Sequence, residues 1–184
     1  MKKLMVMLAA VAMAVGAQAA SVYWTCTNVK DSSGNAVSGV AYLMTTEFLA
    51  DAMTLEGAGA TAVKAALDGY YSYQGTAGAF GVASANAVDQ SLLKLEGGNT
   101  YSAYLIIFDS AEITDSSKFY VTTTKNLIAQ EGASDVGSVK FGSQSTASQA
   151  AGAWHSVGAA VPEPTSGLLM LVGLAGLALR RRRA

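Results

Sequence analysis

The chain is poor in the residues that build catalytic and metal sites. Its 184 residues include one cysteine, Cys26, and one histidine, His155. A single cysteine excludes a disulfide within the chain, and a single histidine excludes a multi-histidine zinc site. A Ser-His-Asp or Cys-His triad would need this one histidine to fold back onto the domain. We therefore expect His155 to be a surface or packing residue, and we predict no catalytic residue, no metal site and no cofactor.

Arginine is missing from the body of the chain. All 13 acidic residues lie between Asp31 and Glu163. Half of the 12 basic residues lie at the two ends: Lys2, Lys3, Arg180, Arg181, Arg182 and Arg183. The part between these basic ends has six lysines against thirteen acids, a net charge of −7. An acidic domain without arginine is poorly suited to bind nucleic acid or anionic lipid. We exclude nucleic acid as a partner and attribute the acidity to solvation.

The N-terminus has the pattern of a secretory signal peptide. Lys2 and Lys3 precede an apolar run from Leu4 to Val15, and Ala17-Gln18-Ala19 is a small-x-small cleavage site. The apolar run is too short for an ordinary membrane-spanning helix, and no stop-transfer pattern follows it. We expect signal peptidase and the secretion machinery to export the chain and remove residues 1–19; the alternative is a retained N-terminal anchor.

The C-terminus combines three features in a fixed order: Pro162-Glu163-Pro164, an apolar run, and the block Arg180-Arg181-Arg182-Arg183. A helix over 165–179 would be about 22 Å long, shorter than a bilayer core of about 30 Å. The prolines prevent a regular helix before it, and Glu163 is costly in lipid. The arginine block favours the cytoplasmic side of the membrane. This pattern predicts a weakly held transmembrane helix, suited to transient insertion in the inner membrane.

These residues together resemble the PEP-CTERM sorting tail, although the resemblance covers only about an eighth of the chain. It is carried by Pro162-Glu163-Pro164, the apolar run and the four arginines 180–183, within five residues of the chain's end. The resemblance implies that an exosortase-like membrane peptidase, found in bacteria that export polysaccharide, cuts the chain near Pro-Glu-Pro. The product would then lie at the cell surface or outside the cell.

Composition divides the chain into four parts. Residues 1–19 are the signal peptide, and residues 20–141 form an exported β-rich domain of a size that builds its own core. Residues 142–161, rich in Ser, Ala and Gly, indicate a linker, with Trp154 favouring a short terminal strand at 153–157. Residues 162–184 are the sorting tail.

Apolar alternation and β-favouring residues predict the secondary structure of the domain. We expect strands at 21–29, 37–44, 71–82, 88–95, 100–108, 118–124 and 138–141. The first two should form a hairpin whose second strand is central, because residues 37–44 are apolar on both faces. Short helices are expected at 48–53 and after Thr61. The fold class is mostly β: an antiparallel two-layer β-sandwich-like domain with one or two short helices in a crossover, plus the C-terminal transmembrane helix.

The first expected strand places Cys26 on the same face as Val22 and Trp24. A cysteine on an apolar strand face is typically buried and inert. We predict a buried thiol; the alternative is a reactive or intermolecular one.

Two sets of polar or aromatic residues are candidates for chemistry. Tyr70, Tyr71 and Tyr73 cluster in sequence and are weak candidates for stacking on a sugar, although core packing is the simpler explanation. Asp109, Glu112 and Asp115 lie close enough to suggest a carboxylate pair. Their loop is rich in Ser and Thr, so turn formation and solvation are the simpler explanation there.

Three functions remain compatible with the sequence. The first is a non-enzymatic surface or extracellular-matrix protein. The second is a carbohydrate-binding module that binds exopolysaccharide through the tyrosine cluster. The third is a small hydrolase that uses the loop carboxylates. The association of the tail with polysaccharide export favours the first.

Overall fold

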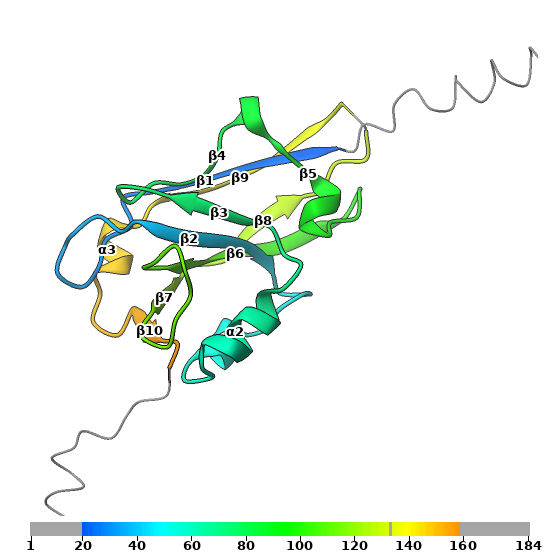
Figure 1. Cartoon of the computed structure of the whole chain (residues 1–184). Coiled ribbons are helices and arrows are strands. Elements are labelled where there is room, and N and C mark those ends of the chain that lie inside the picture. The colour runs from blue at the N-terminus through cyan, green and yellow to red at the C-terminus, as the bar shows by residue number, and fades with distance from the viewer. Residues whose placement is uncertain (1–19, 133, 159–184) are drawn as a thin grey trace, which may run out of the picture.

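A computed structural model describes residues 20–132 and 134–158. Within them, two β-sheets pack face to face and short helices cover the outer face of one sheet (Figure 1). The first sheet comprises β1 (Ser21–Thr27), β4 (Phe80–Val82), β5 (Val88–Asp89) and β9 (Val136–Ser143). The second comprises β2 (Gly39–Thr45), β3 (Ser72–Gly75), β6 (Thr100–Phe108), β7 (Lys118–Val121), β8 (Lys125–Ile128) and β10 (Trp154–Ser156).

Strand β1 organises the first sheet. It pairs in parallel with β9 along its whole length, from Ser21 opposite Val136 to Thr27 opposite Ser143. Its other edge is shared by β4 and β5, both antiparallel to it. The prediction of an antiparallel sandwich is therefore correct for most strand pairs, but the longest pair of this sheet is parallel.

The second sheet is antiparallel, with the strand order β10-β7-β6-β2-β3. Strand β8 pairs with the first half of β6, on the edge where β7 pairs with the second half. Both β2 and β6 have neighbours on each side, as expected for strands that are apolar on both faces. The central position predicted for residues 37–44 is confirmed.

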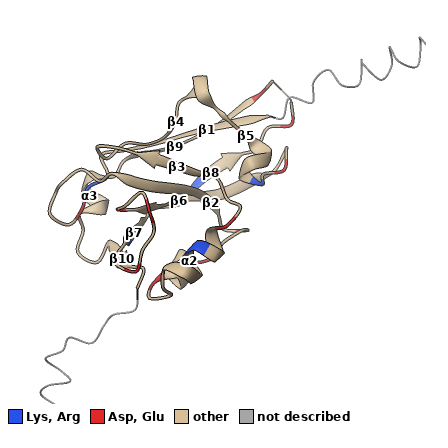
Figure 2. Ribbon diagram, viewed as in Figure 1, with Lys and Arg blue, Asp and Glu red and all other residues tan. Residues whose placement is uncertain are grey.

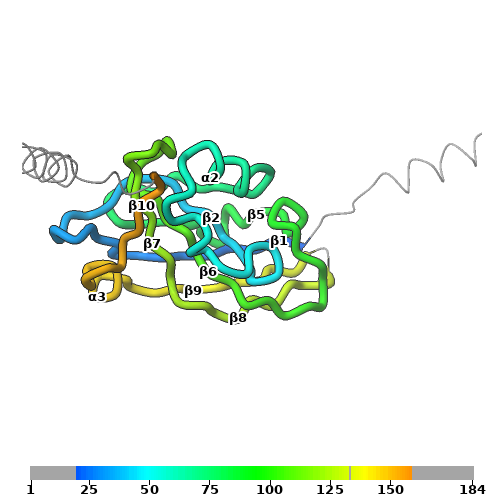
Figure 3. The backbone as a smooth tube through the Cα atoms, turned by 90° about the horizontal axis from the view of Figure 1, so that it is seen from below, coloured from blue at the N-terminus to red at the C-terminus, as the bar shows by residue number. Residues whose placement is uncertain are grey.

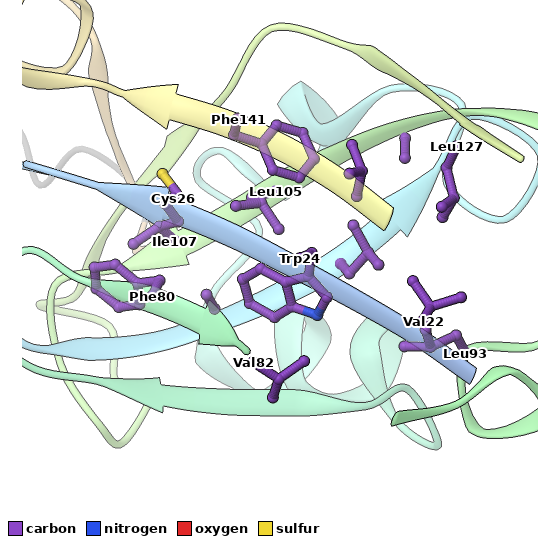
Figure 4. Close-up of a cluster of buried hydrophobic side chains, with 14 of the residues drawn as sticks. Val22, Trp24, Cys26, Phe80, Val82, Leu93, Leu105, Ile107, Leu127 and Phe141 are labelled. Carbon is purple, nitrogen blue, oxygen red and sulfur yellow. The ribbon is translucent and has the colours of Figure 1, made fainter. Parts of the chain in front are cut away.

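The two faces of the second sheet contact separate cores. From β6, Leu105 and Ile107 point into the core between the sheets, whereas Ile106 and Phe108 point into the opposite core. Trp24 of β1 is fully buried at the centre of the inter-sheet core (Figure 4). The domain thus has a third layer beside the predicted two.

The third layer consists of η1 (Ala52–Leu55) and α2 (Ala60–Leu67), which lie in the connection between β2 and β3. Val63 and Leu67 of α2 are buried against the second sheet. The helix predicted after Thr61 is confirmed, and the one predicted at 48–53 is a short 3-10 helix displaced toward residue 55. Three further short helices are η2 (Ser84–Asn86), η3 (Gln90–Leu93) and α3 (Ser145–Ser148).

The predicted hairpin of 21–29 with 37–44 is wrong, because β1 and β2 lie in different sheets. Residues between them form a local turn closed by the Lys30–Ala36 bridge, and the chain then passes to the second sheet. The strand predicted over 88–95 is also wrong beyond Asp89. The carboxylate of Asp89 accepts the Ser91 N–H (2.7 Å) and caps η3.

The short terminal strand expected at 153–157 is confirmed as β10, whereas the remaining described part of the predicted linker 142–161 is folded onto the domain. Residues 145–148 form α3, and β10 pairs with β7. The Trp154 indole N–H donates to the Ser148 carbonyl (2.8 Å), and Ser148 is fully buried. Small residues here permit close packing onto the domain instead of flexibility.

The predicted signal peptide and transmembrane helix 165–179 lie outside the described residues. Among residues 20–132 and 134–158, no helix is long and apolar enough to cross a membrane. The two ends of the described chain lie at opposite ends of the domain (Figures 1 and 3).

Candidate functional site

The tyrosines proposed as a sugar platform contact two different cores. Tyr70 packs on the helix-side core, and the Lys94 Nζ lies 3.7 Å from the centre of its ring. Tyr71 and Tyr73 pack against the inter-sheet core, where the Tyr73 ring meets Trp24 edge-on at 5.8 Å. All three rings are half-buried, so each has a packing role.

The loop carboxylates take part in backbone hydrogen bonds. Asp109 Oδ1 accepts the Lys118 N–H (2.9 Å), which fixes the loop between β6 and β7. Asp115 Oδ1 accepts the Ala60 N–H (2.6 Å) at the first residue of α2. Glu112 is exposed and lies 3.8 Å from the Lys64 ammonium. An exposed pair of this kind contributes little to stability, so this loop mainly holds α2 in place.

Cys26 and His155 both contact other parts of the folded domain. Cys26 is fully buried, and burial raises the pKa of its thiol to about 12, so the nucleophilic thiolate is disfavoured. His155 Nδ1 lies 3.3 Å from Glu56 Oε2, and its ring packs against Phe119. In the part of the chain that the structure describes, no three His, Cys, Asp or Glu residues are arranged to hold a metal.

A groove of about 340 Å³ crosses the outer face of the second sheet beside η1. Its lining combines aliphatic, hydroxyl, carboxylate and imidazole groups: Thr46, Ala50, Asp51, Ala52, Met53, Tyr104, Val121, Thr122, Thr124 and His155. Sequence analysis missed this groove, because its walls come from separate segments of the chain.

Hydrogen bonds hold the walls of the groove in place. The Tyr104 hydroxyl donates to the Leu49 carbonyl; burial, and then the charge of Asp51, raise the pKa of that hydroxyl to about 12. Asp51 Oδ1 accepts the Met53 N–H (2.8 Å). A mostly apolar groove with a few polar groups is suited to hold a small ligand.

The C-terminal end of the described chain is fixed to the domain. The Gly57 N–H donates to the Ser156 carbonyl (2.9 Å), and the Gly59 N–H donates to the Val157 carbonyl (2.8 Å). The Val157 side chain is fully buried in the helix-side core. The segment before the sorting residues is therefore part of the fold.

The loop between β6 and β7 holds the same segment from its other side. The Val157 N–H donates to the Ser117 carbonyl and the Gly158 N–H to the Asp115 carbonyl, both at 3.0 Å. A Cβ on Gly158 would lie 2.5 Å from the Asp115 carbonyl oxygen. Glycine is therefore the residue that allows the chain to leave the domain along this path.

Beyond this fixed segment, residues 160–183 match the PEP-CTERM protein-sorting motif. The chain carries a PEP-CTERM sorting tail. The tail implies export and sorting to the cell surface by an exosortase, a membrane peptidase. No curated protein and no solved structure matches the chain.

The resemblance identified from the sequence is thus confirmed for the tail. The residues expected to direct processing lie outside the described part: Ala17, Ala19, Pro162, Glu163, Pro164, Arg180, Arg181, Arg182 and Arg183. The structure adds how the residues just before the tail are bonded to the domain. The last described residues, Val157 and Gly158, are both buried.

Proposed function

We propose that the chain is an exported, non-enzymatic surface or extracellular-matrix protein that an exosortase-like peptidase releases from its PEP-CTERM tail. The observation that carries the proposal is a sorting motif at 160–183 directly following a folded β domain. The buried thiol of Cys26, the pairing of His155 with Glu56 and the structural bonds of the loop carboxylates all support a role without catalysis. Signal peptidase and the secretion machinery would act first.

Intact-mass measurement on protein from the native host tests the proposal. We expect the mature chain to lack residues 1–19, the apolar run and the arginines when the peptidase is present. Replacing Pro162, Glu163 and Pro164 with alanine should leave a membrane-held form that keeps the tail, whereas Asn99→Ala, in an exposed loop, should be processed normally. A wild-type chain still ending at Ala184 would show that the tail is an ordinary anchor.

Reporter fusions test the orientation that the proposal requires. Because arginine-rich flanks stay cytoplasmic, a reporter after Ala184 should be active in the cytoplasm. A reporter after Val29 should be exported. An exported reporter at the C-terminus would contradict sorting through this tail.

A carbohydrate-binding role is the second candidate, and the groove beside η1 now supports it better than the tyrosines do. Its hydroxyl and carboxylate groups are suited to bind sugar hydroxyls. A glycan array with the purified domain separates this role from a passive matrix role. Asp51→Asn should weaken a genuine signal, whereas Asp135→Asn, in a distant turn, should not.

The hydrolase alternative uses Asp109, Glu112 and Asp115, two of which are engaged in backbone hydrogen bonds. Incubating the purified domain with exported polysaccharide of the native host tests this alternative. Reducing ends that appear with the wild type but not with Glu112→Gln would favour it.

A further inference from the structure

We infer that the end of the domain from which the sorting tail leaves is a docking surface for the processing peptidase. We call it the exit surface; it is formed by residues 56–60, 112–117 and 156–158. The inference deepens the proposed function and rests on it, because it requires that the tail be processed. It starts from the hydrogen bonds that fix residues 156–158.

The first step is the length of chain between the domain and the motif. Gly158 is buried and bonded to Asp115, and only three residues separate it from Pro162. A fully extended chain spans at most about 3.6 Å per residue. The motif therefore cannot lie farther than about 14 Å from Gly158, a distance shorter than the nine-residue strand β6, which spans about 30 Å.

The second step is that this distance cannot increase while the domain is folded. Release of the segment would expose Val157, which is fully buried, and break its bond to Ser117. Release of the three residues before Val157 as well would unpair β10 from β7. A peptidase that reaches the motif at the membrane surface must therefore contact the folded domain, and the exit surface is the part that it meets.

The third step is the charge of the exit surface. Glu56, Glu112 and Asp115 are exposed there, and Figure 2 shows acidic segments on the loops flanking the end of the described chain. Within the described residues of this surface there is no lysine, although Lys64 of α2 approaches Glu112. Anionic lipid headgroups would repel these carboxylates. The surface is therefore better suited to contact an uncharged or basic protein face than the membrane.

Site-specific photo-crosslinking in the native host tests the inference. A photo-reactive amino acid replaces Ser116, which is exposed on the exit surface, or Asn99, which is exposed at the far end of β6. We expect the full-length precursor to crosslink to the peptidase at least about five-fold more from position 116 than from position 99. Equal yields at the two positions, or products with lipid alone from position 116, would overturn the inference.

A longer spacer provides the second measurement. About ten Gly and Ser residues inserted after Gly158 raise the maximum reach to about 50 Å, so the domain can turn away from the membrane. A docking surface should keep a preference for position 116, although a smaller one. A preference that falls to unity with the long spacer would show that the short tether alone produced the contact, and would overturn the inference. A wild-type tail that is never removed would instead refute the proposed function.

Discussion

The two ends of the described chain are held in different ways. At the N-terminal end, β1 lies between β9 on one edge and β4 and β5 on the other, and its buried side chains reach the centre of the inter-sheet core. At the C-terminal end, β10 is a three-residue strand at the edge of the second sheet. Strand β1 is therefore required for the inter-sheet core. Strand β10 only closes one edge of the second sheet.

The last described residue at each end is nevertheless buried in the domain. Ala20 is buried, and its carbonyl accepts the Gln90 N–H (2.8 Å). Val157 and Gly158 are buried at the other end. The two ends therefore differ in how much they stabilise the domain, and substitutions can measure this difference.

The largest loss of stability is expected for a substitution in β1, at the N-terminal end. Trp24→Ala removes a fully buried indole from the inter-sheet core and should lower the free energy of unfolding by about 4 kcal/mol. Denaturant unfolding of the exported domain measures it. Tyr23→Ala, on the opposite, half-buried face of β1, is the control and should cost less. An equal cost for the two would mean that the core is not centred on Trp24.

A smaller loss of stability is expected for a substitution at Val157, at the C-terminal end. Val157→Ala should cost about 2 kcal/mol, because the side chain is fully buried in the helix-side core. The matched control is Val136→Ala, since Val136 is 46% exposed and exposed positions usually change stability by less than about 0.5 kcal/mol. Equal effects in denaturant unfolding would show that residues 156–158 do not stabilise the domain.

Alkaline pH should destabilise the domain in part through Cys26 of β1. Burial raises the pKa of the Cys26 thiol from 9.0 to about 12 in the folded state. Below pH 9 the thiol is protonated in both states; above it the unfolded state loses the proton first, so stability falls as pH rises from 9 to about 12. The slope approaches about 1.4 kcal/mol per pH unit. Because burial also raises the pKa values of Tyr42, Tyr104 and Tyr120, the measurement is the difference from Cys26→Ala, which should lack the component due to the thiol.

The smallest loss of stability is expected for Cys26→Ala at neutral pH. Removal of the sulfur leaves a small cavity, which should lower the free energy of unfolding by about 1 kcal/mol. A thiol reagent should label the native wild type slowly and the denatured chain quickly, because Cys26 is fully buried. Rapid labelling of the native protein would place the thiol at the surface and contradict the strand register.

Patterns within one strand or helix could be predicted from the sequence. The alternation of Val22, Trp24 and Cys26 gives the buried face of β1, and the apolar residues of 100–108 give the doubly buried strand β6. Strand β8 was missed, since Lys125 and Asn126 are exposed and conceal its one buried residue, Leu127. Local alternation carries no information on partners, so the parallel pairing of β1 with β9 was not predicted.

The sorting tail and the exit surface illustrate the same distinction. The tail is a contiguous motif, so the sequence alone identified it. The exit surface depends on bonds from Gly57 and Gly59 to Ser156 and Val157, residues far along the chain. Nothing in the composition of 142–158 indicates these partners, which is why small residues were interpreted as a linker.

The pairing of β1 with β9 has a consequence for the order of events during export. Ser21 and Val136 are neighbours in the sheet although they are 115 positions apart in the sequence. A chain exported N-terminus first would bring β1 out of the secretion channel long before its longest partner. The apolar face around Trp24 would then stay exposed to solvent for most of translocation. Exposed apolar surface of this kind favours aggregation. Completion of the sheet is thus timed by the passage of residues 136–143, shortly before the tail reaches the membrane.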